Sequence, residues 1–195
     1  MREGLFCTIF AYFVLRMRVS VWLLGLALCW AQSEIAIRAA LEGKGDGPVE
    51  VTFRQGSRSI RMPAQLQKGL LHLSWPANWQ GPAEIILSAP GYLPVRYKHP
   101  ISPGKPHYLD LTDPKSLHEG SSFVLIEGKA HLAAGDLGQL PDETHPIINA
   151  YDIELFYLAQ KSQDLKADFT GDGRVDEADF ALLLKNQNLL LRSVL

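Results

Sequence analysis

Oxygen-bearing side chains recur at regular spacing between residues 168 and 179. They occupy the first, third, fifth, ninth and twelfth positions of this stretch, with glycine at the sixth, as Asp168, Thr170, Asp172, Asp176, Asp179 and Gly173. Ca²⁺ is a hard cation that takes about six to eight such oxygen ligands in flexible geometry. Gly173 permits the sharp turn that would fold these oxygens around one point. The spacing therefore predicts a calcium-binding loop at 168–179.

The remaining positions of this loop have expected roles of their own. The first three side-chain oxygens would be joined by the backbone carbonyl of Arg174. Asp176 would act directly or through a water molecule, and Asp179 would close the shell with one or both carboxylate oxygens. The apolar Val175 is expected if the loop pairs its backbone with a second loop. The alternative interpretation is an acidic surface turn that binds nothing.

A helical pattern follows this loop but does not precede it. Phe180, Leu183 and Leu184 recur at helical spacing, whereas residues 161–164 have the composition of a turn. A calcium loop with one exiting helix is half of an EF-hand. The general EF-hand motif ends in Glu, whereas this loop ends in Asp179.

Half of an EF-hand suggests a second copy, and a degenerate one lies 27 residues earlier, where Ile148, Asn149 and Asp152 correspond to Val175, Asp176 and Asp179. Its loop would begin at Asp136 and carries an insertion around 139–144. Asp142 or Glu143 would replace the missing central ligand. The candidate ligands of this second, degenerate calcium loop are thus Asp136, Asp142, Asn149 and Asp152. We expect one bound Ca²⁺ and leave a second open.

Two calcium-loop-and-helix repeats in an exported chain resemble a dockerin domain. The resemblance rests on residues 167–180 and on Gly135-Asp136 with residues 148–152, and it spans 133–188. It implies a protein–protein attachment module, because dockerins bind cohesin modules and dock polysaccharide-degrading enzymes onto scaffolds or bacterial cell surfaces. Recognition in that family uses a Ser-Thr-type pair just before the last ligand. The corresponding residues here are Ala150, Tyr151, Glu177 and Ala178, and the partner would be a cohesin-like or cell-surface protein.

The size of this segment suggests how it would be stabilised. Apolar stripes on its two helices would pack together, but a unit of about 55 residues without disulfides has little core. We therefore expect bound calcium to supply much of its folding free energy, and chelation to unfold 133–188.

Residues 33–128 are rich in short alternating segments. Turn formers separate them at intervals of about ten residues, which predicts an antiparallel β-sandwich of seven to eight strands. The candidate strands are 35–39, 49–54, 59–62, 70–75, 83–87, 92–97, 107–111 and 123–126. The stretch 87–95, with 101–104 and 109–111, resembles carboxypeptidase-regulatory-like or fibronectin-like modules. This resemblance implies a non-catalytic spacer or presentation module.

Two other functions deserve comparison with attachment. Trp75 and Trp79 flank a Pro-Ala-Asn turn and could stack on a glycan, although core packing is the commoner use of large aromatic side chains. An enzyme is disfavoured because the chain contains no nucleophile elbow, phosphate loop or His-rich metal motif. The carboxylates suited to glycosidase chemistry (Glu50, Glu84 and Asp110) fall on separate candidate strands. We expect no catalysis.

The first 31 residues indicate export. From Met17, a short basic segment, an apolar run and a small-x-small site ending at Ala31 form a secretory signal peptide, with residues 1–16 as an over-extended start. A membrane anchor at 5–31 is the alternative, but Arg16 and Arg18 interrupt it. We expect a secreted or cell-surface protein with no stable membrane span after signal removal.

The charged residues and cysteines divide unevenly along the chain. Three of the 19 basic residues and one of the 21 acidic residues precede Gln32, so the rest carries a formal charge of −4. Such a charge disfavours a nucleic-acid partner. Both cysteines, Cys7 and Cys29, lie in the signal segment, which excludes an internal disulfide from the body. Residues 189–195 form a C-terminal tail.

Overall fold

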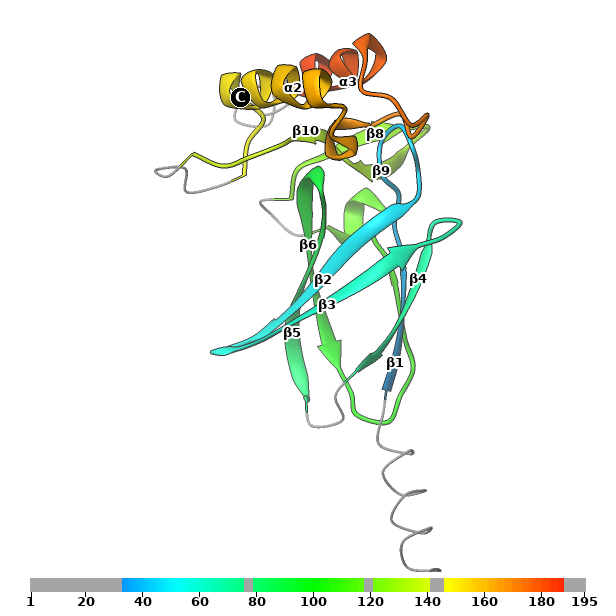
Figure 1. Ribbon diagram of the computed structural model, residues 1–195. Coiled ribbons are helices and arrows are strands. Elements are labelled where there is room, and N and C mark those ends of the chain that lie inside the picture. Colours follow the sequence, from blue (N-terminus) through cyan, green and yellow to red (C-terminus); the bar gives the residue numbers. More distant parts are fainter. Residues whose placement is uncertain (1–32, 76–78, 118–120, 141–145, 188–195) are drawn as a thin grey trace, which may run out of the picture.

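The computed structural model describes residues 33–75, 79–117, 121–140 and 146–187. Strands form most of the molecule, and two helices lie across one end of the sheets (Figure 1). The mainly β architecture with two helices is confirmed. The strands are β1 (Ser33–Arg38), β2 (Gly47–Gln55), β3 (Arg58–Leu66), β4 (Leu70–Trp75), β5 (Gly81–Ala89), β6 (Gly91–Ile101), β7 (His107–Asp110), β8 (Phe123–Ile126), β9 (Lys129–Leu132) and β10 (Ala134–Asp136). The helices are α2 (Ala150–Ser162) and α3 (Glu177–Gln187), with 3₁₀ turns η1 (Pro114–Ser116) and η2 (Leu165–Ala167).

The strands pair in one sheet of five, one of three and a hairpin. The five-stranded sheet has the order β10-β6-β5-β2-β3, the three-stranded sheet has the order β4-β1-β7, and β8 pairs with β9. The prediction that all strands are antiparallel is wrong for β1 and β7, which pair in parallel. The physical reason is that β6 descends from the helix end, so β7 returns toward the helices in the direction of β1 (Figure 1).

Strand alternation accounts for the core. In β2, Val49, Val51 and Phe53 are buried, and cross-strand pairing sets Val51 opposite Leu87 and Phe53 opposite Ile85 of β5. Full burial of such side chains contributes about 1.5–3 kcal/mol each. These residues form one buried cluster with Ile35 and Ile37 of the smaller sheet.

Trp79 belongs to the same cluster and is 3% exposed. Its ring therefore packs in the core, as the favoured interpretation expects, and the alternative of a glycan-stacking platform is wrong for Trp79. For Trp75, the structure describes only its place at the end of β4.

The helices share this core with the sheets. Phe156 of α2, Leu183 of α3 and Phe169 between them are each 0% exposed and join Tyr92 of β6 and Ala134 of β10 in the buried cluster. β10 lies inside the range 133–188, yet it pairs with β6. The segment that we expected to have little core thus draws its core from the strands beside it.

Several predicted segments lie outside the described residues: the signal segment 1–31, Asp142 and Glu143, and the tail 189–195. Among the helices that the structure describes, none is both long and apolar enough to cross a membrane.

Candidate functional site

Helix α2 begins with a capping box that also fixes the entering chain. The Asn149 side chain accepts the N–H of Tyr151 at 2.7 Å, and Asp152 Oδ2 accepts the N–H of Asn149 at 2.8 Å. Asp152 Oδ1 accepts two further N–H groups, from Leu137 at 2.8 Å and Gly138 at 3.2 Å. The buried Asp152 thus connects the helix to the two residues that follow Asp136.

Helix α3 begins with the same arrangement. Asp176 Oδ1 accepts the N–H of Ala178 at 2.8 Å, and Asp179 Oδ2 accepts the N–H of Asp176 at 3.0 Å. Asp179 Oδ1 accepts the N–H groups of Phe169 at 2.7 Å and Thr170 at 2.8 Å. These are the two residues that follow Asp168. The hydrogen bonds are therefore equivalent in the two units: Asp136 occupies the position of Asp168, and Asp152 that of Asp179, as the internal repeat predicts.

The loop at 168–179 folds around its first residue. Asp168 Oδ1 accepts the N–H of Gly171 at 2.7 Å, and Oδ2 accepts the N–H of Gly173 at 3.0 Å. The Thr170 hydroxyl lies 3.5 Å from Oδ1. Both glycines have positive φ, +76° and +86°, a conformation that favours glycine. The sequence motif thus produces a closed turn centred on Asp168, which is 7% exposed.

The donor chemistry of this loop fits a calcium ion, since its candidate side chains offer only oxygen. The geometry fits in part. Among the described residues, no three His, Cys, Asp or Glu side chains converge on a point where they could hold a metal. The carboxylates of Asp172 and Asp176 instead accept backbone N–H groups two residues ahead, at 2.9 and 2.8 Å. Each of these bonds occupies one carboxylate oxygen, so the second oxygen of Asp172 and of Asp176 is left for an ion.

The closing ligand is more restricted than predicted. Asp179 Oδ1 already accepts two N–H groups, which fills its two lone pairs, whereas Oδ2 accepts one. This arrangement leaves room for Asp179 to bind an ion through Oδ2 alone, not through both oxygens.

Val175 pairs with a side chain instead of the expected second loop. Its N–H donates to Gln163 Oε1 at 3.2 Å, and its carbonyl accepts from Gln163 Nε2 at 3.3 Å. Gln163 caps α2 in the left-handed conformation, φ 54°. Ile148, the counterpart of Val175, packs in the core beside Gly135.

The residues expected at the partner-recognition positions lie at the beginnings of the two helices. Ala150, Glu177 and Ala178 are exposed, and Tyr151 is half-buried. Exposed apolar side chains lie further along α2, where Tyr157 is 53% and Leu158 is 58% exposed.

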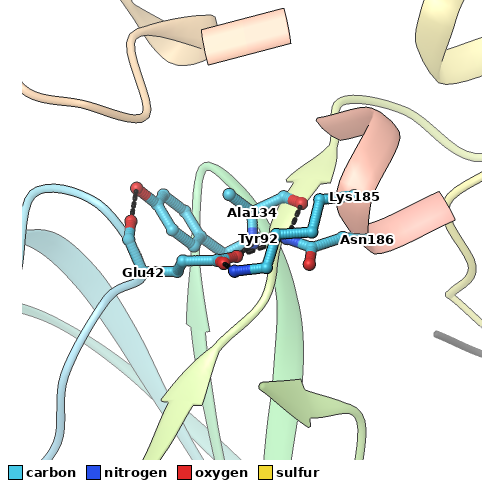
Figure 2. A network of polar contacts seen from close by, with 5 residues as sticks. All are labelled: Glu42, Tyr92, Ala134, Lys185 and Asn186. Atoms are coloured by element: carbon cyan, nitrogen blue, oxygen red, sulfur yellow. Dashed lines mark hydrogen bonds and ion pairs between the residues drawn. The ribbon is translucent and has the colours of Figure 1, made fainter. Parts of the chain in front are cut away.

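A buried carboxylate joins α3 to the chain between β1 and β2 (Figure 2). Glu42 is 1% exposed, and its carboxylate accepts from Lys185 Nζ at 2.8 Å, from Asn186 Nδ2 and from the N–H of Ala134 at 3.2 Å. Asn186 Nδ2 also donates to the carbonyl of Ala134 at 2.9 Å. Lys185 is exposed, whereas Glu42, Ala134 and Asn186 are buried. The hydrogen bonds of Glu42 and Asn186 to Ala134 hold the end of α3 against β10.

Tyr92 extends this network toward the loop. Its hydroxyl donates to the carbonyls of Glu42 at 3.0 Å and Phe169 at 3.3 Å. Burial raises the pKa of Tyr92, and the carboxylates of Glu42, Asp168 and Asp179 add to the rise, so the hydroxyl keeps its proton. Its ring meets that of Phe169 edge-on, with centroids 5.7 Å apart.

Lys44 approaches the loop from the turn that precedes β2. Its Nζ donates to the carbonyl of Asp168 at 3.4 Å and lies 5.3 Å from the centre of the Tyr92 ring. Burial lowers the pKa of Lys44, while the nearby carboxylates of Asp168 and Asp179 oppose that fall. The Gly-rich composition of residues 43–47 indicates only a turn, and no sequence pattern singles out Lys44, Glu42, Tyr92 or Gln163. No local pattern links residue 44 to residue 168.

No family model matches this chain, and no curated protein matches it. One chain from each of two crystal structures of interface mutants of a type II Cohesin-X-Dockerin complex from Acetivibrio cellulolyticus is similar in structure. The first, an N-terminal interface mutant, has a TM-score of 0.48 and 14% identity over 79% of this chain and 94% of that one. The second, a C-terminal interface mutant, has a TM-score of 0.45 and 16% identity over 80% and 94%. A DUF3823 family protein from Bacteroides ovatus has a TM-score of 0.30 and 14% identity over 42% and 44%. Similarity at this level assigns neither partner nor activity.

Proposed function

We propose that this chain is a non-catalytic attachment module of a secreted or cell-surface protein, in which residues 133–188 form a dockerin-like pair of loop–helix units. The observation that carries the proposal is the repeated hydrogen-bond pattern at Asp152 and Asp179. In both units a buried aspartate ties the first turn of a helix to the beginning of its loop. Such a repeat is the physical basis of a paired loop–helix module.

Calcium is the ion proposed for the loop at 168–179. Asp168, Thr170, Asp172, the carbonyl of Arg174, Asp176 and Asp179 would hold it, the last through one oxygen. The ion would neutralise carboxylates that lie together in one short loop. The first loop has fewer candidate ligands, and for this reason we assign the stronger site to 168–179.

The partner proposed is a cohesin-like or cell-surface protein that covers the outer face of α2. Tyr157 and Leu158 supply exposed apolar area there, and buried apolar side chains contribute most to protein interfaces. Ala150, Glu177 and Ala178 would lie at the edge of the same contact.

Biolayer interferometry against a panel of type I and type II cohesin modules tests this proposal, in calcium and in chelator. We expect binding that chelator weakens and that Leu158→Glu reduces at least tenfold, because a charge would be buried in the contact. Leu125→Glu is the matched control, since Leu125 is similarly exposed, at 62%, but belongs to β8 and not to α2. Failure of every cohesin to bind, or equal loss in the two variants, would contradict the proposed partner.

Calcium binding is tested separately by isothermal titration calorimetry on the purified chain. We expect one binding event, and Asp168→Asn should weaken its affinity at least tenfold. Absence of binding at millimolar calcium would contradict the metal assignment and leave the partner test unaffected.

A further inference from the structure

Lys44 is a half-buried cation pressed against the loop that carries the acidic motif. Its stem lies directly over Gly171, where an added Cβ would come 2.7 Å from Lys44 Cβ. Its ammonium group donates to the carbonyl of Asp168 at 3.4 Å. The neighbouring Gly43 leaves no room for a side chain against the Phe169 carbonyl. The turn before β2 and the loop at 168–171 are therefore in close contact.

The loop beneath Lys44 holds two buried carboxylates. Asp168 is 7% exposed and Asp179 is 0% exposed, and they accept hydrogen bonds from backbone N–H groups and the Thr170 hydroxyl. Backbone donors offset part of the cost of burying a carboxylate, and a nearby cation offsets more of it. Lys44 reaches the loop from a segment 124 residues before Asp168. Its ammonium group bonds the main-chain carbonyl of Asp168, and the charges of the Asp168 and Asp179 carboxylates act on it without a direct ion pair among the described residues.

We propose that Lys44 is the built-in counter-cation of the loop at 168–179, so that the loop keeps its fold without metal and a bound calcium ion must share the loop with the ammonium group. The proposal rests on the proposed calcium site for its second half only. Two like charges held in one small volume repel each other, so Lys44 weakens calcium binding. In exchange, Lys44 makes the fold of the loop less dependent on calcium.

This arrangement also connects the metal state of the loop to the sheets. An ion that displaced the ammonium group would release Lys44 from the Asp168 carbonyl and from its position over the Tyr92 ring. The turn at Gly43 and Lys44 would then be the first part of the β region to change conformation when an ion binds.

The test compares Lys44→Met, which removes the charge but keeps an apolar stem, with Lys44→Arg, which keeps the charge. Lys129→Met is the matched control, because Lys129 is an exposed residue of β9. Calorimetric calcium titration at low ionic strength is expected to show about three- to tenfold tighter binding for Lys44→Met, as removal of one nearby charge predicts. Wild type, Lys44→Arg and Lys129→Met should bind alike, and the gain should shrink in high salt.

Thermal melts in chelator and in saturating calcium provide the second measurement. We expect Lys44→Met to melt lower than wild type in chelator and to gain more from calcium than wild type does. A purely structural role of the lysine stem would lower both melts equally and would overturn the proposal. So would calcium affinity that is unchanged or weaker in Lys44→Met. If no variant binds calcium, the calcium assignment fails, and the chelator melts alone decide the counter-cation role.

Discussion

The two loop–helix units begin their helices in the same way but differ in their loops. Asp152 and Asp179 each accept three backbone N–H groups, at equivalent positions of the repeat. Only in the second unit does the structure describe a loop wound around its first aspartate, with two glycines at positive φ and Lys44 packed on top. The comparison teaches that this motif initiates a helix without needing the full set of candidate metal ligands. The first unit keeps the capping aspartate although it has fewer residues suited to a metal.

The largest effect is expected from removing either capping aspartate. Asp152→Ala and Asp179→Ala each leave three N–H groups without their acceptor in a buried region, which costs about 3 kcal/mol or more of unfolding free energy. Urea denaturation followed by far-ultraviolet circular dichroism measures the loss. Similar losses in chelator would support a shared capping role, whereas a loss confined to Asp179→Ala would break the equivalence of the two units.

The next effect separates the units by metal binding. Asp168→Asn removes one formal charge and weakens an oxygen ligand, so calcium affinity should fall at least tenfold. Asp136→Asn should change the affinity of that site by less than about twofold, because it alters the other loop. Calorimetric titration of both variants provides the measurement, and equal losses would indicate one site shared between the loops.

A smaller effect tests the packing of Lys44 over the second loop. Gly171→Ala places a methyl group against the lysine stem and also strains a residue at φ +76°, so we expect a loss of about 2 kcal/mol. Gly173→Ala is the control, because it has φ +86° but nothing within 4 Å of an added Cβ. It should lose only about 1 kcal/mol. Chemical denaturation of both variants compares their free energies of unfolding. Equal losses would show that Lys44 moves away from the added methyl group at little cost.

The smallest effect concerns Gln163, which pairs with Val175. Gln163→Ala removes two hydrogen bonds from a part-buried backbone segment and should cost about 1 kcal/mol. Amide hydrogen exchange at Val175 should become faster, while exchange at Tyr151 in the first unit should stay unchanged. Faster exchange at both positions would indicate that the units open together.

The sequence predicted what depends on local spacing. Alternation located the eight predicted strands, the helical spacing of Phe180, Leu183 and Leu184 located α3, and the internal repeat then located α2. β10 was missed because its three residues, Ala-Gly-Asp, are too few for alternation to emerge. β9 was missed because its sequence, Lys-Ala-His-Leu, has only Ala and Leu as apolar residues, whereas β8, of the same length, is entirely apolar. The parallel pairing of β1 with β7 was missed because it depends on where the chain turns after β6.

Contacts between distant residues were beyond reach for the same reason. His99 and His107 are eight residues apart and share no motif in the sequence, yet His99 Nε2 of β6 and His107 Nδ1 of β7 lie 2.9 Å apart. Lys44 and Glu42 lie in a segment whose Gly-rich composition predicts only a turn. Their roles come from residues 168–186, which the fold brings to that turn.

The Glu42 network has a consequence for the order in which the chain can fold. Glu42 and Asn186 are 144 residues apart, so their hydrogen bond closes nearly the whole described chain. Contacts of such high sequence separation form late, since the loop entropy between them must be lost first. During synthesis the strands emerge long before residues 185–186, and until then the Glu42 carboxylate lacks Lys185 and Asn186. Completion of α3 is therefore the step that buries this carboxylate, and a ribosome-bound chain without α3 would leave it exposed to water.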